Sequence, residues 1–285
     1  MILEKGTHFI WETARHLERA IFAYRFDSAP ATRILQILQS YQNDDGGFGH
    51  ALEPDLRAPD SQPLFVEFAL HTLYECNLRD VPLATKVCDF LAKHADLHQG
   101  IPTIFPSARQ FPRAPHWHNP AAEAPSFDRL TGLVGLVHWQ GVQHPWLEAA
   151  VAACLANVET AHYTDAHTIL TAFCLIESLP QTAKVDALFQ KLAQELSTAN
   201  FFWAETPVTG YGLTPLHFAP TPHAYCRRLF TDAQIESHLQ ELAAQQEADG
   251  GWPIAWEPPS LMARCEWRAH RTVNALSTLH AYGYL

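Results

Sequence analysis

The sequence is poor in basic residues and has no long apolar run. Its 285 residues include 19 Lys and Arg against 30 Asp and Glu, which gives a formal net charge of -11. A surface that follows nucleic-acid phosphates must be basic, so this balance argues against a large nucleic-acid interface. No apolar run approaches the roughly 20 residues that a membrane-spanning helix needs. We therefore expect a soluble protein with no transmembrane segment and no nucleic-acid partner.

The sequence also lacks a CxxC pair and a secretion signal. Acids and bases are interleaved from Glu4 onward, without the basic region and unbroken apolar run of a signal peptide. Without a paired spacing, the cysteines indicate neither a disulfide scaffold nor a zinc knuckle. We predict that they are reduced, mostly core residues of a cytoplasmic protein without a cofactor. The six are Cys76, Cys88, Cys154, Cys174, Cys226 and Cys265.

Strand-like alternation is almost absent, and helical periodicity dominates. Apolar residues between Ile10 and Tyr24 recur at steps of three and four, which predicts that they share one face of a first helix. Thr231 and Gln234 have the spacing of a capping box at a helix start. Further helices are predicted at about 30 to 42, 62 to 77, 82 to 95, 127 to 140, 145 to 157, 164 to 178, 181 to 197, 231 to 247 and 262 to 282.

The predicted helices are of two kinds. Those that contain residues 64 to 70, 130 to 137 and 169 to 176 are apolar nearly all round, so other protein must surround them. The helices at 181 to 196 and 231 to 247 have one polar face, as outer helices would. Alternating buried and half-exposed helices predict an all-α fold, an α/α toroid of five or six helical hairpins.

A repeat supports this fold. The segment from Gln42 to Phe48 matches the segment from Gln246 to Trp252, 204 residues further on, and the same offset places Glu53 on Glu257. Two segments interrupt the rhythm, at about 98 to 125 and 200 to 230, and their aromatic content favours lids. We expect one domain over residues 1 to 285.

The Gln-x-x-x-Gly-x-aromatic pattern at Gln42, Gly46 and Phe48, repeated at Gln246, Gly250 and Trp252, resembles the repeat motif of triterpene cyclases. In that superfamily, which includes the β-subunits of protein prenyltransferases, the motif ties together the outer helices of an α/α toroid. The longer strings that follow both Gly-Gly pairs also resemble a group of bacterial proteins. That second resemblance implies a fold but no activity.

The sequence departs from these families at their catalytic motifs. Squalene-hopene-type cyclases use an Asp-x-Asp-Asp acid motif, whereas the adjacent pair Asp44-Asp45 lies in the repeat turn. The Asp-x-Cys pair that holds zinc in prenyltransferases is missing, and so is the Asp-Asp-x-x-Asp pattern that binds magnesium and diphosphate. The 17 histidines show no recognised ligand spacing. We predict no metal site.

The acidic stretch from Glu53 to Ser61 is the first candidate site. A partly desolvated carboxyl beside a buried helix holds its proton to higher pH and can act as a general acid. Glu53 and Asp55 are the better acids, with Asp60 as a further candidate and His50 and Arg57 as substrate contacts. The alternative is that Asp60 or Ser61 caps the next helix and Arg57 neutralises Glu53.

The second copy of the repeat supplies the second candidate site. Arg264 and Arg268 are four residues apart and share a helix face, as do Glu266 and His270. The arginines suit a carboxylate or phosphate, although an internal ion-pair network is an alternative. Glu257, Glu266 or His270 would accept a proton, and Trp256, Arg264 and Arg268 would contact the substrate.

Aromatic residues of the irregular segments either line a central hole or plug it. Lining aromatics could stabilise a carbocation by about 0.5 to 2 kcal/mol for each contact. The expected substrate contacts among them are Trp117, Trp203 and Tyr211. A plug would instead be ordinary core packing.

These observations lead to three hypotheses for function. The first is a metal-independent enzyme for acid-initiated cyclisation, isomerisation or dehydration of a hydrophobic isoprenoid, with Glu53 or Asp55 as the proton donor. The second is a non-catalytic module that binds a lipid or peptide. The third is a carbohydrate-active enzyme on an α/α barrel, which would have two carboxylates, aromatic sugar platforms and a polar cleft.

Overall fold

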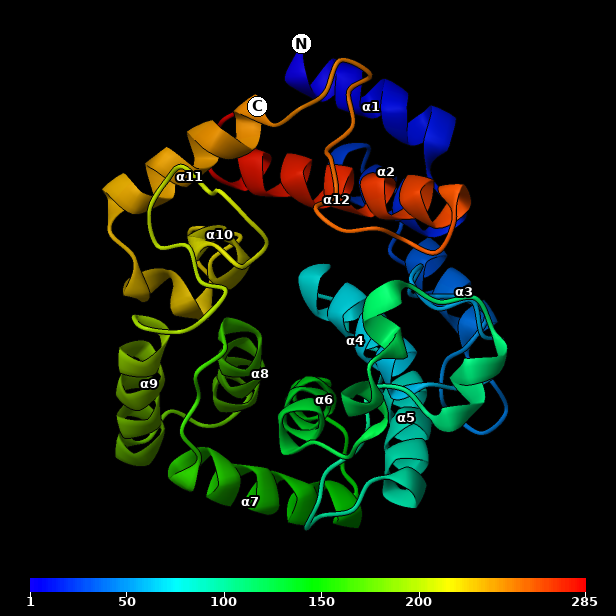
Figure 1. Cartoon of the computed structure of the whole chain (residues 1–285), viewed down its shortest axis with the longest axis vertical. Coiled ribbons are helices and arrows are strands. Elements are labelled where there is room, and N and C mark those ends of the chain that lie inside the picture. The colour runs from blue at the N-terminus through cyan, green and yellow to red at the C-terminus, as the bar shows by residue number, and fades with distance from the viewer. The chain divides into compact units, whose positions relative to one another are not determined.

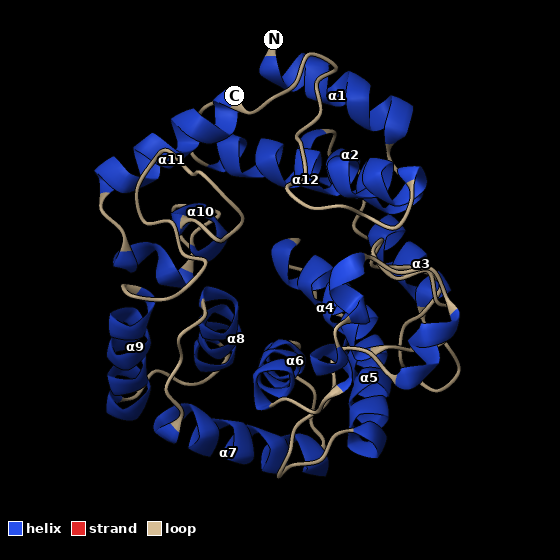
Figure 2. Cartoon of the chain, in the orientation of Figure 1, coloured by secondary structure: helices blue, strands red, loops and turns tan.

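The computed structural model describes all 285 residues, and every regular element in it is a helix (Figures 1 and 2). The prediction of an all-α fold is confirmed. None of the helices has the length and apolar character that crossing a membrane requires. The helices are α1 (Ile2–Thr13), α2 (His16–Phe26), α3 (Thr32–Tyr41), α4 (Pro63–Glu75), α5 (Val81–His94), α6 (Phe127–Trp139), α7 (Pro145–Thr160), α8 (Ala166–Glu177), α9 (Ala183–Leu196), α10 (Pro215–Phe218), α11 (Asp232–Ala244) and α12 (Leu261–Ala281).

Local sequence signals fix most helix ends. Proline occupies the first turn of α4, α5 and α7, where its missing N–H leaves no bond unmade. The capping box at α11 is confirmed, because the Thr231 hydroxyl accepts from the Gln234 N–H at 3.2 Å and Gln234 Oε1 accepts from the Thr231 N–H at 3.0 Å. Side chains also cap the starts of α5 (Asp80), α6 (Ser126), α8 (Asp165), α9 (Thr182) and α12 (Ser260).

The prediction of one continuous first helix is wrong. The chain leaves helical geometry at Ala14 and Arg15, with ψ values of 151° and 169°, so that α1 and α2 are separate. The apolar spacing runs on across this break, which is why periodicity alone missed it. Glu18 accepts two hydrogen bonds from the Arg15 guanidinium just after the break, at 2.6 and 3.1 Å.

The chain forms two compact units. Unit 1 comprises Met1–Ile37 and Asn200–Leu285, and unit 2 comprises Leu38–Ala199. In unit 2, α4, α6 and α8 pack side by side in one layer, and α5, α7 and α9 cover them (Figure 1). The first three are the helices whose sequences are apolar nearly all round, because they have protein on most sides. In unit 1, α12 packs against α1, α2 and α11, and α10 packs against α11.

The two irregular segments contain short helices. The segment at about 98 to 125 holds three 3-10 helices, Pro106–Gln110, Pro115–His118 and Pro120–Glu123. The segment at about 200 to 230 holds α10 and a 3-10 helix over Tyr225–Leu229. Aromatic residues of the second segment pack on one another, with ring centroids of Phe202 and Phe218 at 5.6 Å and of Phe218 and Phe230 at 6.2 Å. This trio forms a local core.

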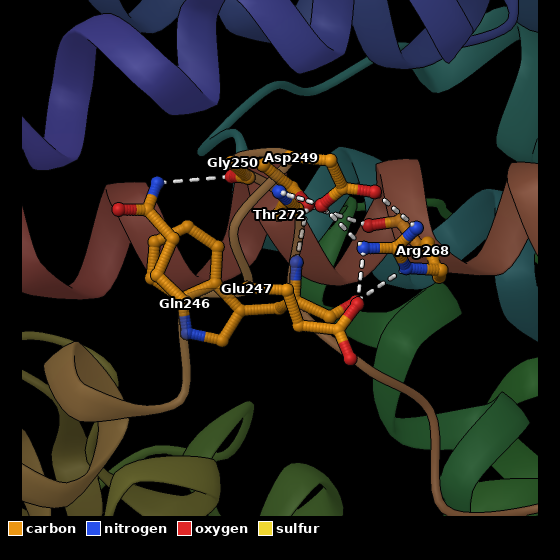
Figure 3. Close-up of polar contacts among 8 residues, drawn as sticks. Gln246, Glu247, Asp249, Gly250, Arg268 and Thr272 are labelled. Carbon is orange, nitrogen blue, oxygen red and sulfur yellow. Dashed lines mark hydrogen bonds and ion pairs between the residues drawn. The ribbon is translucent and has the colours of Figure 1, made fainter.

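The two Gly-Gly turns have the same contacts in their separate units. Gln42 Nε2 donates to the Gly46 carbonyl at 3.0 Å and to the Leu83 carbonyl of α5 at 3.2 Å. Gln246 Nε2 donates to the Gly250 carbonyl, as Figure 3 shows, and to the Ile2 carbonyl of α1, both at 2.9 Å. Each glutamine therefore fastens its own turn to the first turn of a second helix.

The two turns also approach their second helices in the same way. The second helix is α5 for the first turn and α1 for the second. A Cβ on Gly46 would overlap the Lys86 carbonyl, and one on Gly250 would overlap the Lys5 carbonyl. Helix α1 thus takes the place in the second copy that α5 takes in the first.

The turn glycine should therefore resist substitution more than a glycine with the same backbone and free space. Gly250 has φ of 92° and would overlap α1, whereas Gly283 has φ of 79° and nothing within 4 Å of an added Cβ. Gly283→Ala should lower the free energy of unfolding by about 1 to 2 kcal/mol through its backbone alone. Gly250→Ala should lower it by about 1 to 3 kcal/mol more, because α1 must move. Urea denaturation measures both, and equal losses would refute the close approach.

Candidate functional site

An ion network joins α2 and α12 in unit 1. The fully buried Glu18 is held by the guanidinium of Arg15, and Arg15 Nη1 also lies 3.9 Å from Oε2 of Glu266, itself 6% exposed. Burial raises the pKa of Glu18, but Arg15 more than offsets this and the net pKa is lowered. Glu18 is therefore an anion that the protein has already neutralised. Glu266, which the sequence proposed as a proton acceptor, belongs to this network.

His270 lies one helical turn beyond Glu266 on α12. Burial lowers its pKa to about 4, against the opposing effect of Glu18 and with the help of Arg15, Arg271 and Arg25. Asn274 Nδ2 lies 3.2 Å from His270 Nε2 and orients the ring. The imidazole is thus neutral at pH 7 and has the form that accepts a proton.

Two tryptophans lie beside this network. The Trp256 and Trp267 rings meet edge to face at 5.2 Å, and Trp267 meets the His270 ring in the same way at 5.6 Å. Trp267 and His270 come from α12, and Trp256 comes from the loop before it. Both tryptophans are half-buried. The sequence proposed Trp256 but gave Trp267 no role.

The two arginines proposed for substrate contact have partners within the chain. Arg264 Nη2 donates to both carboxylate oxygens of Glu257 at 2.9 Å, in an exposed pair. Arg268 donates to Asp249 at 2.8 Å from two nitrogens and to Glu247 at 2.5 Å, as Figure 3 shows. Its guanidinium also lies 4.7 Å from the centre of the Phe9 ring of α1. Arg268 therefore joins the repeat turn to α12 and α1, as the ion-pair alternative anticipated.

The acidic stretch of unit 2 is buried. Glu53 and Asp55 are 5% and 2% exposed, Glu53 Oε2 accepts from the Asp55 N–H at 2.8 Å, and Asp55 Oδ2 lies 3.5 Å from Nε2 of His116. Burial lowers the pKa of His116, so the imidazole is the neutral neighbour of this carboxyl. Arg57 Nη1 donates to the Pro54 carbonyl at 3.5 Å.

Neither Asp60 nor Ser61 caps α4, so the prediction that one of them would do so is wrong. The residue that precedes the helix is Gln62, whose side chain makes no capping bond. Asp60 instead accepts from the Gln62 amide at 2.8 Å and from the Ser107 hydroxyl, which fixes the 98 to 125 segment. The Ser61 hydroxyl donates to Asp45 of the repeat turn at 2.7 Å. Both side chains hold loops together.

The remaining proposed contacts lie in loops. His50 Nε2 is 3.0 Å from Asn43 Oδ1 at the surface of unit 2. Trp117 packs against the ring of His116, with centroids 4.5 Å apart. In unit 1, Trp203 Nε1 donates to the Tyr211 carbonyl at 3.3 Å, and the Tyr211 side chain is exposed.

Sequence reasoning missed a second group of charges on the apolar helices of unit 2. Arg129 of α6 pairs with Glu67 of α4. Burial lowers the pKa of Arg129 to about 10, with Glu53 opposing, and burial alone lowers the pKa of His71 of α4 to about 4. Glu67 and His71 are four residues apart within an otherwise apolar helix, a pattern that could have revealed them. In neither unit do three His, Cys, Asp or Glu residues come together to hold a metal ion.

Comparisons with known proteins define a fold and no activity. No family model matches the chain, and no curated protein sequence matches it. A crystal structure of a protein from Actinoplanes superposes with a TM-score of 0.55, covers 98% of each chain and is 16% identical in sequence. At this identity the similarity shows a shared fold alone.

The neutral state of His270 predicts a pH dependence of stability. The pKa of His270 is 6.5 in the unfolded chain and about 4 in the folded protein. At a pH between these two values, the unfolded chain binds a proton that the folded protein does not. The free energy of unfolding should therefore fall as the pH drops through this window, by about 3 kcal/mol at most from this residue. In urea denaturation, His270→Gln should show a smaller fall in the free energy of unfolding between pH 7 and pH 4.5 than the native protein shows. His8→Gln, at an exposed histidine of α1, is the control, and the same pH dependence in both variants would contradict the assignment.

Proposed function

We propose that this protein is a carbohydrate-active protein with an α/α-toroid fold, and that its saccharide lies against Trp256 and Trp267. The observation that carries the proposal is the tryptophan pair beside His270, Glu266 and the Arg15–Glu18 ion pair. Half-buried indole rings offer apolar faces to the C–H groups of a sugar ring, and neighbouring polar groups suit its hydroxyls.

The polarity of this face favours a saccharide over the hydrophobic isoprenoid that the sequence first suggested. An isoprenoid gains nothing from charged groups, and covering them without new hydrogen bonds is unfavourable. The aromatics at Phe202, Phe218 and Phe230, which could have shielded a carbocation, contact one another.

The neutral imidazole is the group best suited to chemistry. His270 can accept a proton from a bound hydroxyl or C–H acid, while Asn274 holds the ring in place. Glu18 would stabilise the imidazolium that forms and Arg15 would oppose it, because their charges have opposite signs.

Acid-initiated isoprenoid chemistry is the second candidate, and the burial of Glu53 and Asp55 favours it. In that case these carboxyls of unit 2 would protonate the substrate. The isoprenoid should then bind without dependence on Trp256.

Replacing Trp256 should weaken saccharide binding. Trp256→Ala removes one stacking face and should raise the dissociation constant about tenfold, which corresponds to about 1.4 kcal/mol. Trp11→Ala is the matched control, because Trp11 lies on α1 of the same unit and is 48% exposed. Isothermal titration with a panel of neutral and acidic oligosaccharides, and with farnesol, measures both. Binding of farnesol but of no saccharide would overturn the proposal.

A further inference from the structure

The buried donors of unit 1 include three side-chain N–H groups for which the protein supplies no acceptor. They are Nε of Arg19 on α2, Nε of Arg271 on α12, and Nε1 of Trp256. Each such atom costs about 1 to 3 kcal/mol if nothing bonds to it, more where the group is charged. Native proteins leave few polar groups in this state. Each of these three groups could donate a hydrogen bond to a ligand that carries acceptors.

Arg271 differs from the other arginines of α12 because its side chain has no hydrogen-bonded partner in the protein. Arg264 and Arg268 are paired with Glu257 and Asp249, whereas Arg271 makes no ion pair or hydrogen bond through its side chain. Burial lowers the pKa of Arg271, against the opposing effect of Tyr211. A guanidinium remains charged at neutral pH even so. The protein therefore holds this cation half-buried without supplying an anion for it.

The electrostatic environment has the same sign. Of the four charged groups that act on His270, Arg15, Arg25 and Arg271 are cations and only Glu18 is an anion. Trp267 and Arg271 are four residues apart on α12, so that the unpaired cation shares a helix face with a ring of the tryptophan pair.

We infer that this face of α12 binds an acidic group, a carboxylate or a phosphate, carried by the saccharide. Arg271 supplies the charge, and the N–H group of Trp256, whose ring packs on Trp267, is a further donor. The acidic character of the sugar rests on the proposed function, but the anion site does not. A planar guanidinium donates two parallel hydrogen bonds to either group, which makes Arg271 the residue that selects an acidic ligand over a neutral one.

The anion site is tested first with inorganic phosphate, so that its outcome does not depend on which sugar is bound. Phosphate should bind the full-length protein, with Trp fluorescence or isothermal titration as the readout. Arg271→Gln should weaken binding at least tenfold, and Arg264→Gln, on the same helix, should leave it unchanged. The inference would be overturned if both variants bound phosphate as the native protein does, or if both lost phosphate binding.

Thermal stability without ligand separates a binding role from a structural one. Removing an unpaired buried cation should leave the melting temperature of Arg271→Gln unchanged or higher. A clear fall would mean that Arg271 serves the fold and would overturn the inference.

Oligosaccharides then distinguish the two proposals. Oligogalacturonate should bind more tightly than a neutral galacto-oligosaccharide of equal length, and Arg271→Gln should abolish the preference while retaining the neutral ligand. Equal affinities in the native protein would refute the acidic sugar and leave the carbohydrate function standing. Phosphate binding that depends on Arg271, without binding of any saccharide, would refute the carbohydrate function and leave the anion site.

Discussion

The amide of the glutamine that precedes each Gly-Gly turn is the contact on which the repeat depends. Both hydrogens of the Gln42 amide are used, one within the turn and one on α5, and Gln246 does the same with α1. One side chain thus links a local turn to a helix distant in sequence. The contact requires a residue without Cβ at Gly46 and Gly250, because the lysine carbonyl of the second helix fills that space. Since the second copy uses α1, its packing includes residues from both ends of the chain.

The charges on α2 and α12 have a different relation to the fold. A buried carboxylate such as Glu18 needs its cation, and Arg15 satisfies it with two hydrogen bonds. Replacing such a network with apolar residues is often neutral or stabilising, so stability does not account for its presence. Its effect is chemical, because it keeps charges of both signs around an imidazole that burial holds neutral. In unit 2, apolar side chains make up most of the contacts between the inner helices. The charged or titratable groups among them include Arg129, Glu67 and His71.

Much of the fold could be predicted because its signals are local. Caps such as Thr231 and the apolar character of α4, α6 and α8 depend on neighbouring residues, and those helices lie where the sequence placed them. The break at Ala14 was missed because the apolar spacing continues through it. The equivalence of α1 and α5 left only a short signal, a lysine four residues before a phenylalanine at Lys5 and at Lys86. Of the residues in the candidate site, the sequence singled out Trp256, Glu266 and His270. Arg15 and Glu18 join them only because α2 packs against α12.

Arg268 and Arg271 show why residue type alone could not locate the site. They lie three residues apart on one helix, and in sequence either could bind an anion. The guanidinium of Arg268 is saturated by Asp249 and Glu247 and lies over Phe9, so that a ligand would have to displace contacts which the fold uses. Arg271 has no such contacts to lose. The free energy of binding is the difference between the occupied and the empty site. A bound anion would therefore gain its whole interaction with Arg271, whereas at Arg268 it would first have to replace existing hydrogen bonds. The residue that the fold leaves unsatisfied is the one that a ligand can use.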